Sequence, residues 1–150
     1  MKIELINIDR ERRLAVNLSG IVGFAGANHR GDVLLIQGLF NYIARGLYPG
    51  AVGLGGEHKI PEITGVINAD TYSAISEFQI QNASSLLMSH FDGRIHPANY
   101  PNRQLHSNAK RMMSITLLHI MASDAAVMQG HSDYIQGLAA LQPELAAVID

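Results

Sequence analysis

The chain has no cysteine, and this absence removes several kinds of chemistry at once. Without cysteine there is no disulfide framework, no thiolate metal site and no thiol nucleophile. Charge is also scarce, because charged residues make up 16% of the sequence and the formal net charge is −2. The basic excess typical of nucleic-acid-binding proteins is therefore missing. No run of about 20 apolar residues is present, so the sequence predicts no membrane-spanning helix.

The N-terminal stretch MKIELINIDRERR lacks the apolar core of a signal peptide. We therefore expect the chain to stay in the cytoplasm as synthesised, unless a dedicated secretion system or cell lysis exports it. The sequence has 150 residues, of which 47% are hydrophobic, and this predicts one globular domain over residues 1–150.

Common catalytic and nucleotide-binding motifs are missing too. There is no Gly-x-Ser-x-Gly elbow and no His-Glu-x-x-His zinc motif. Gly53 and Gly55 begin a Gly-x-Gly-x-x-Gly pattern, but His58 stands where the third glycine belongs. We interpret the glycine-rich stretch 46–62 as a flexible loop without a nucleotide site.

Two enzymatic alternatives stay open at this point. One is a metal-dependent hydrolase with a zinc site built from a histidine-rich set, namely His90, Asp92 and His96 with His106 or His119. The other is a glycosidase using Glu57 and Glu77 as paired carboxylates. The histidine set has no His-Glu-x-x-His motif and no pair at i, i+4 spacing, and nothing in the sequence brings Glu57 and Glu77 together. We therefore expect no catalysis, no cofactor and no bound metal.

Apolar spacing predicts a mainly α-helical bundle preceded by a short β-hairpin. Residues 2–18 alternate between apolar and polar on either side of a charged turn, which is typical of a hairpin over residues 1–20. A helix is predicted from Asp32 to Gly46, with an apolar stripe at Val33, Ile36, Leu39, Phe40 and Ile43. Gly38 inside it predicts the close approach of another helix.

The stretch Ile63–Asn82 contains a turn at Gly65 followed by a helix. Asn68 is a suitable N-cap for that helix, and its apolar face carries Tyr72, Ala74, Ile75 and Phe78. The same pattern returns in DGRIHPAN, residues 92–99, where Gly93 matches Gly65, Ile95 matches Ile67 and Pro97 matches Ala69. We therefore expect a second glycine turn that leads into a helix beginning at Pro97.

The C-terminal part, residues 102–150, reads as a helical extension. Apolar residues from Leu105 to Met121 predict one long helix that begins at Asn102 and ends near Gly130. Two short helices should follow it, with Pro143 at the start of the second.

Three pieces of the sequence together resemble the small three-helix peptidoglycan-binding domains. The stretch DVLLIQGLFNYIA resembles the family's first helix, TGVINADTYSAISEFQ its central signature, and DGRIHPAN its second Asp-Gly turn. The resemblance covers residues 30–100. It departs from the family pattern at Thr64, which replaces an Asp, and at Asn68 and His96, which stand at glycine positions.

The resemblance implies a non-catalytic module that recognises murein or its fragments. A shallow groove near the two turns would need polar side chains and an aromatic face, and the residues available for this are Tyr72, Gln79, Asn82, Asp92 and Arg94. Three of them have structural alternatives: Tyr72 in the core, Gln79 bracing a turn and Arg94 in solvent. The alternative function is a cytoplasmic protein-interaction module on the same scaffold, such as an adaptor, immunity or chaperone-like protein for a secreted wall-active effector in a phage or type VI secretion context.

Overall fold

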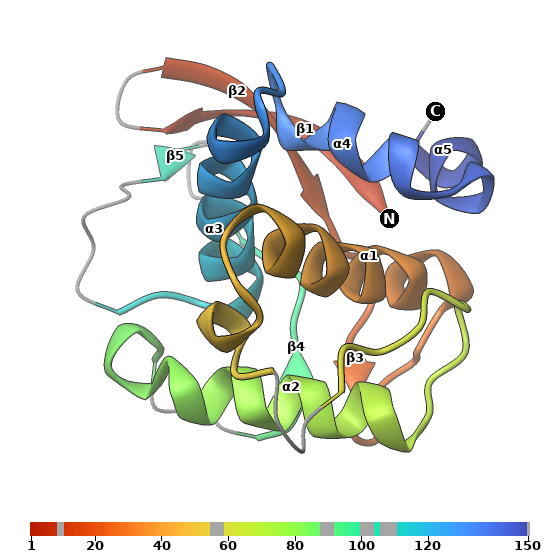
Figure 1. Cartoon of the computed structure of the whole chain (residues 1–150). Helices are drawn as coiled ribbons and strands as arrows, with labels where there is room; N and C mark the ends of the chain where they lie inside the picture. Colours follow the sequence, from red (N-terminus) through yellow and green to blue (C-terminus); the bar gives the residue numbers. More distant parts are fainter. Residues whose placement is uncertain (9–10, 55–58, 88–91, 100–103, 106–110, 150) are drawn as a thin grey trace.

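The computed structural model describes residues 1–8, 11–54, 59–87, 92–99, 104–105 and 111–149. Figure 1 shows the arrangement, which is mainly α-helical with a small sheet at one side. The elements in chain order are β1 (Lys2–Ile8), β2 (Glu11–Asn17), β3 (Val22–Gly23), α1 (Arg30–Gly46), η1 (Pro49–Val52), α2 (Ala69–Gln81), η2 (Ala83–Ser85), β4 (Arg94–Ile95), β5 (Gln104–Leu105), α3 (Ser114–Gln129), α4 (Tyr134–Leu141) and α5 (Pro143–Ile149).

The predicted N-terminal hairpin is present. Strands β1 and β2 pair antiparallel, with Lys2 opposite Asn17 and Ile8 opposite Glu11. Strand β5 adds to the other side of β1 in parallel, so the sheet order is β2-β1-β5. The strand β2 therefore lies at an edge of this sheet.

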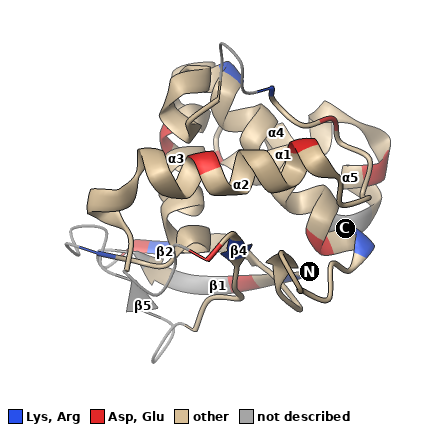
Figure 2. Ribbon diagram, turned by 90° about the horizontal axis from the view of Figure 1, so that it is seen from below, with Lys and Arg blue, Asp and Glu red and all other residues tan. Residues whose placement is uncertain are grey.

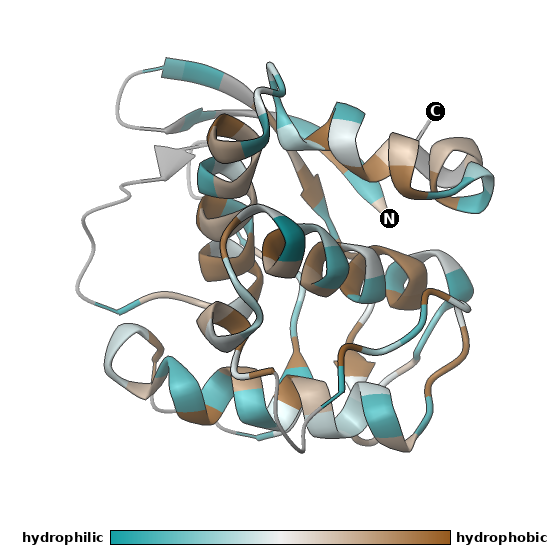
Figure 3. Ribbon diagram, in the orientation of Figure 1, coloured by the Kyte–Doolittle hydropathy of each residue, from teal (hydrophilic) through white to brown (hydrophobic). Residues whose placement is uncertain are grey.

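Helix α1 is the centre of the core. The predicted apolar stripe is fully buried, and Leu34, Leu35 and Tyr42 on its other faces are buried as well. Helix α3 packs against it, and α4 and α5 cover another side (Figures 1 and 3). Gly38 makes the last contact possible, because a Cβ there would lie 2.9 Å from a methyl carbon of Leu145.

Helix α2 lies on the opposite side of α1 from the hairpin (Figure 1). Its N-cap is Asn68, as predicted, and the side chain of Asn68 accepts a hydrogen bond from the backbone N–H of Thr71. Phe78 is fully buried and meets Phe40 of α1 edge to face at 5.9 Å between ring centroids. The stretch 46–62, predicted to be a flexible loop, contains η1, and Val52 within it is buried in the core.

The prediction of a helix beginning at Pro97 is wrong. The second turn leads into β4, which pairs with β3, and residues 96–99 are not helical. The side-chain amide of Asn17 explains this, because its Oδ1 accepts from Ala98 N at 2.7 Å and its Nδ2 donates to Ala98 O at 2.9 Å. A distant side chain thereby takes the backbone groups that a helix would use.

The prediction of a long helix beginning at Asn102 is also wrong, because α3 begins at Ser114 and residues 104–105 form a strand. Met112 is held extended by two backbone bonds, to Ser85 O and from Leu87 N. The C-terminal half of the prediction is confirmed: Gly130 caps α3 in the left-handed region, and Pro143 begins α5. No helix in the described ranges is both long and apolar enough to cross a bilayer.

Candidate functional site: two glycine turns and an exposed phenylalanine

The first glycine turn is held by a glutamine from the preceding helix. Gly65 has φ +75°, in the left-handed region that glycine adopts at least cost. The Oε1 atom of Gln37 accepts from the backbone N–H of Gly65 at 2.9 Å, and Nε2 of Gln37 donates to Val66 O at 3.1 Å. Thr64 Oγ1 closes the turn by accepting from Val66 N.

The second turn repeats this arrangement one helix later. Gly93 has φ +70°. The Oε1 atom of Gln79 accepts from Gly93 N at 2.9 Å, and Nε2 of Gln79 donates to Arg94 O at 2.9 Å. Here Asp92 Oδ1 accepts from Arg94 N, in the place that the Thr64 hydroxyl takes in the first turn. The predicted duplication of the turn is therefore present in the hydrogen bonds, although the segments after the two turns differ.

These contacts bear on the roles of two predicted site residues. Gln79 is 2% exposed, and both ends of its amide bind the turn, so it braces the turn and does not reach a ligand. Asn82 caps the end of α2 by donating to Phe78 O and also donates to Ala51 O. The binding role predicted for Gln79 is therefore corrected to a structural one. The binding role of Asn82 stays a prediction, because its side chain is partly exposed and these two bonds use its Nδ2 alone.

Asp92 and Arg94 remain at the surface of the second turn. The second carboxylate oxygen of Asp92 lies 2.9 Å from Nε2 of His96, and both side chains are partly exposed. Partial burial works to raise the pKa of Asp92, but the hydrogen bonds from His96 and from the backbone outweigh it, so that the pKa lies below its ordinary value. The carboxylate is therefore ionised at neutral pH.

Arg94 carries the positive charge of the same turn. Its Nε is shielded from solvent and has no hydrogen-bond partner in the described part of the chain. A buried donor without an acceptor is costly. Figure 2 shows the basic position of β4 beside α2, which carries two acidic positions, Asp70 and Glu77.

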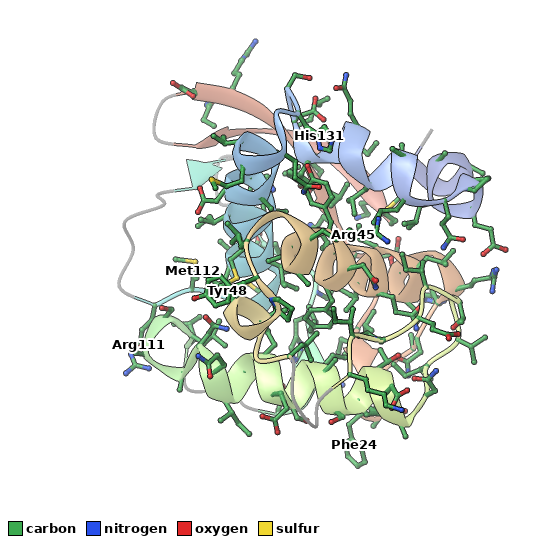
Figure 4. All side chains as sticks on the ribbon, in the orientation of Figure 1. Phe24, Arg45, Tyr48, Arg111, Met112 and His131 are labelled. Atoms are coloured by element: carbon green, nitrogen blue, oxygen red, sulfur yellow. The ribbon has the colours of Figure 1, made fainter. Side chains whose placement is uncertain are left out.

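An exposed aromatic ring stands next to this turn, on the loop after β3. Phe24 is 70% exposed, and its backbone N–H donates to Gly93 O at 3.2 Å. Figure 4 shows its ring projecting beyond α2 and away from the body of the molecule. The ring is thereby attached to the second turn through the backbone, and it makes the site larger than the sequence predicted.

The loop that presents Phe24 is strained and well braced. Ala25 and Asn28 have φ of +53° and +50°, which non-glycine residues seldom adopt. The side chain of Asn28 holds the loop by accepting from Gly23 N and donating to the carbonyls of Gly23 and Gly26. Strain that is stabilised in this way clusters at functional sites, so we include Phe24 and its loop in the candidate site.

Tyr72 lies on the exposed face of α2, with 36% of its surface in solvent. Ser76, one turn further along, faces the second glycine turn, because a Cβ at Gly93 would lie 3.7 Å from Ser76 Oγ. Tyr72 and Ser76 share one face of the helix by their spacing. Tyr72 therefore lies on the same side of α2 as the second turn. The alternative prediction, that Tyr72 packs in the core, is wrong.

We call the surface formed by Phe24, Tyr72, Asp92, Arg94 and His96 the turn face. Its groups are an aromatic ring, a phenol, a carboxylate, a guanidinium and an imidazole. The sequence analysis missed Phe24, and it considered His96 only as a metal ligand. Phe24 lies between glycines in SGIVGFAGANHRG. A large aromatic residue in a glycine-rich loop was the feature of the sequence that could have indicated an exposed binding group.

The two enzymatic alternatives stay predictions. His90, His106 and Glu57 lie outside them, and no three acidic or histidine side chains within them come close enough to hold a metal ion. His119 lies in α3, where its Nδ1 meets the hydroxyl of Tyr134 at 2.6 Å.

Comparisons of the chain with protein-family models, with curated proteins and with solved structures gave no significant match.

Proposed function

We propose that this chain is a non-catalytic recognition module that binds murein or its fragments through the turn face. The single observation that carries the proposal is the exposed ring of Phe24, held out by a strained loop whose backbone is bonded to the second glycine turn. An apolar ring kept in solvent at a conformational cost calls for a binding role.

The chemistry of murein fits the groups on this face. The carbon-bound hydrogens of a sugar ring can stack on the Phe24 ring, as apolar surface does on aromatic faces. Carboxylates of the stem peptide are acceptors for the guanidinium of Arg94, which is partly exposed. The carboxylate of Asp92 accepts from sugar hydroxyls or amide N–H groups. The resemblance of residues 30–100 to peptidoglycan-binding domains supports the same ligand, and the repeated Gln–Gly turn is consistent with that resemblance.

Co-sedimentation with purified murein sacculi tests the proposal. Wild-type protein should sediment with the sacculi at moderate salt, and Phe24→Ala should weaken this by about tenfold, since about 1.4 kcal/mol of contact is removed. Tyr48→Ala is the matched control, because Tyr48 is also exposed, at 63%, but lies on the loop after α1. Absence of wild-type sedimentation, or an equal loss in both variants, would overturn the proposal.

The second candidate is a protein-interaction module on the same scaffold. Val127 and Met128 favour it, because they are 77% and 70% exposed at the end of α3. Adjacent apolar side chains in solvent are typical of contact surfaces. Purification of a tagged chain from its native cells, followed by the same purification with Val127→Ser and Met128→Ser, distinguishes the two candidates. If wild type purifies with a stable partner and the double variant does not, the protein-interaction module is favoured. If the double variant still binds sacculi, the murein-binding module is favoured.

A further inference from the structure

Strand β2 has a free edge that opens into a cavity. In the sheet order β2-β1-β5 the strand has β1 on one side, and Val16 N donates at 3.0 Å to the hydroxyl of Tyr134 on the other. The N–H of Val16 therefore points away from β1. Because N–H directions alternate along a strand, the backbone N–H and C=O groups of Leu14 and Arg12 point the same way.

These edge groups have no hydrogen-bond partner within the described residues, whereas the neighbouring Val16 has one. The cavity beside them has a volume of about 460 Å³. Its walls include Arg12, Leu14, His119, Ser123, His131 and Tyr134. An unpaired strand edge is a template for another extended chain, and here the template continues into a pocket that can take side chains.

Charge and apolarity along the edge specify the occupant. Arg12 is exposed, and His119 and His131 add imidazoles to the same cavity. The cavity also contains one carboxylate, from Asp133, which caps α4 by accepting from Gln136 N, so the positive charge is confined to the strand edge at Arg12. Leu14, two residues from Arg12 on the same face of β2, is 49% exposed, and Val127 across the cavity is 77% exposed. The edge thus offers one positive and one apolar position at strand spacing.

We propose that β2 binds an extended acidic peptide segment of a partner protein by strand addition at Arg12 and Leu14. The bound segment places an Asp or Glu opposite Arg12 and an apolar side chain opposite Leu14. Side chains on one face of a strand repeat every second position, so one residue of the peptide separates the acidic residue from the apolar one. This surface lies on the hairpin side of the molecule, and it is separate from the turn face beside α2 (Figure 1).

Selection from a displayed library of linear peptides of about ten residues tests the proposal. The full chain is the bait, and Leu14→Pro is the counter-selection, since proline removes the outward N–H and is tolerated in an edge strand at such a position. Leu14→Val is the matched control that keeps the N–H. We expect enriched peptides with an acidic and an apolar residue two positions apart, binding that falls about tenfold or more in Leu14→Pro and persists in Leu14→Val.

Two further measurements keep the test decisive if the proline variant unfolds. Arg12→Glu should weaken the selected peptides by about tenfold, and the amide resonance of Leu14 in ¹⁵N-labelled wild type should shift on peptide addition as its N–H gains an acceptor. Failure to enrich peptides, an unshifted Leu14 amide, or peptides without acidic residues that ignore Arg12→Glu would overturn the proposal.

Discussion

The amide of Gln79 holds the turn at Gly93 in the same way that the amide of Gln37 holds the turn at Gly65. In each pair the glutamine accepts from the glycine N–H and donates to the carbonyl of the next residue. In each pair Nε2 also approaches a hydroxyl in the first turn of the following helix, Thr71 of α2 or Ser114 of α3. One amide therefore connects a helix, a turn and the start of the next helix, and this unit occurs twice.

Loss of one such amide should be costly. Gln79→Ala removes all three hydrogen bonds of this amide and leaves the N–H of Gly93 and the carbonyl of Arg94 without partners. We therefore expect a loss of about 2–4 kcal/mol in the free energy of unfolding. Urea unfolding followed by circular dichroism measures it. Gln81→Ala, an exposed glutamine on the same helix, is the control and should change stability by less than about 0.5 kcal/mol. Similar losses in both variants would contradict the bracing role.

The two turn glycines should differ in their response to alanine. Both have positive φ, so alanine costs each about 1–2 kcal/mol. A Cβ at Gly65 would also lie 2.8 Å from Nη1 of Arg30, whereas at Gly93 the nearest atom is 3.7 Å away. Gly65→Ala should therefore be the more destabilising substitution in thermal unfolding. Gly130→Ala, with φ +72° and an open environment, should match Gly93→Ala. A larger loss for Gly93→Ala than for Gly65→Ala would refute the crowding argument.

Asn28 should control how well the loop presents Phe24. Asn28→Ala removes three loop hydrogen bonds and also puts alanine at φ +50°, whereas Asn28→Gly removes the bonds and tolerates the angle. We expect the alanine variant to be less stable than the glycine variant by about 1 kcal/mol. Both should sediment less with sacculi than wild type, because the ring is no longer held in place. Full sacculus binding by both variants would show that the conformation of this loop is not needed for murein binding.

Local signals in the sequence predicted the elements whose ends are decided locally. The cap at Asn68, the left-handed end at Gly130 and the start at Pro143 depend on neighbouring residues alone. The helix predicted at Pro97 failed because Asn17, far away in the chain, bonds the backbone of Ala98. The start of α3 failed for the same kind of reason, since Met112 pairs with the chain at Ser85.

In the candidate site, too, local features could be predicted from the sequence and features that depend on distant residues could not. Asp92 and Arg94 were predicted because they belong to the turn motif itself. For Gln79 the sequence left two roles open, ligand binding and bracing of a turn, and the fold decides for the second by bringing the turn at Gly93 against it. The outward direction of Phe24 depends on the bond from its N–H to Gly93 O, which no local pattern encodes.

The stability contributed by Asp92 should depend on pH with a definite sign. Its pKa is lower in the folded chain than its ordinary value, so its contribution is complete above about pH 4 and is lost as the pH falls through the lower folded value. The urea midpoint of wild type should exceed that of Asp92→Asn at pH 7, and the difference should shrink as the pH is lowered toward 3. A difference that grows on acidification would reverse the assigned direction.

The hydroxyl of Tyr134 joins β2 to α3, and its removal should affect stability more than removal of the hydroxyl of Tyr42. Tyr134 is 2% exposed, and its hydroxyl accepts from Val16 N and meets Nδ1 of His119, both inside the core. Tyr134→Phe leaves the buried Val16 N–H without its acceptor, so we expect a loss of about 1–3 kcal/mol. The hydroxyl of Tyr42 bonds a partly exposed His131, and Tyr42→Phe leaves a ring nitrogen that water can reach. Paired urea titrations at pH 7 compare the two variants, and an equal or larger loss for Tyr42→Phe would show that the edge of β2 at Val16 is not held by this bond.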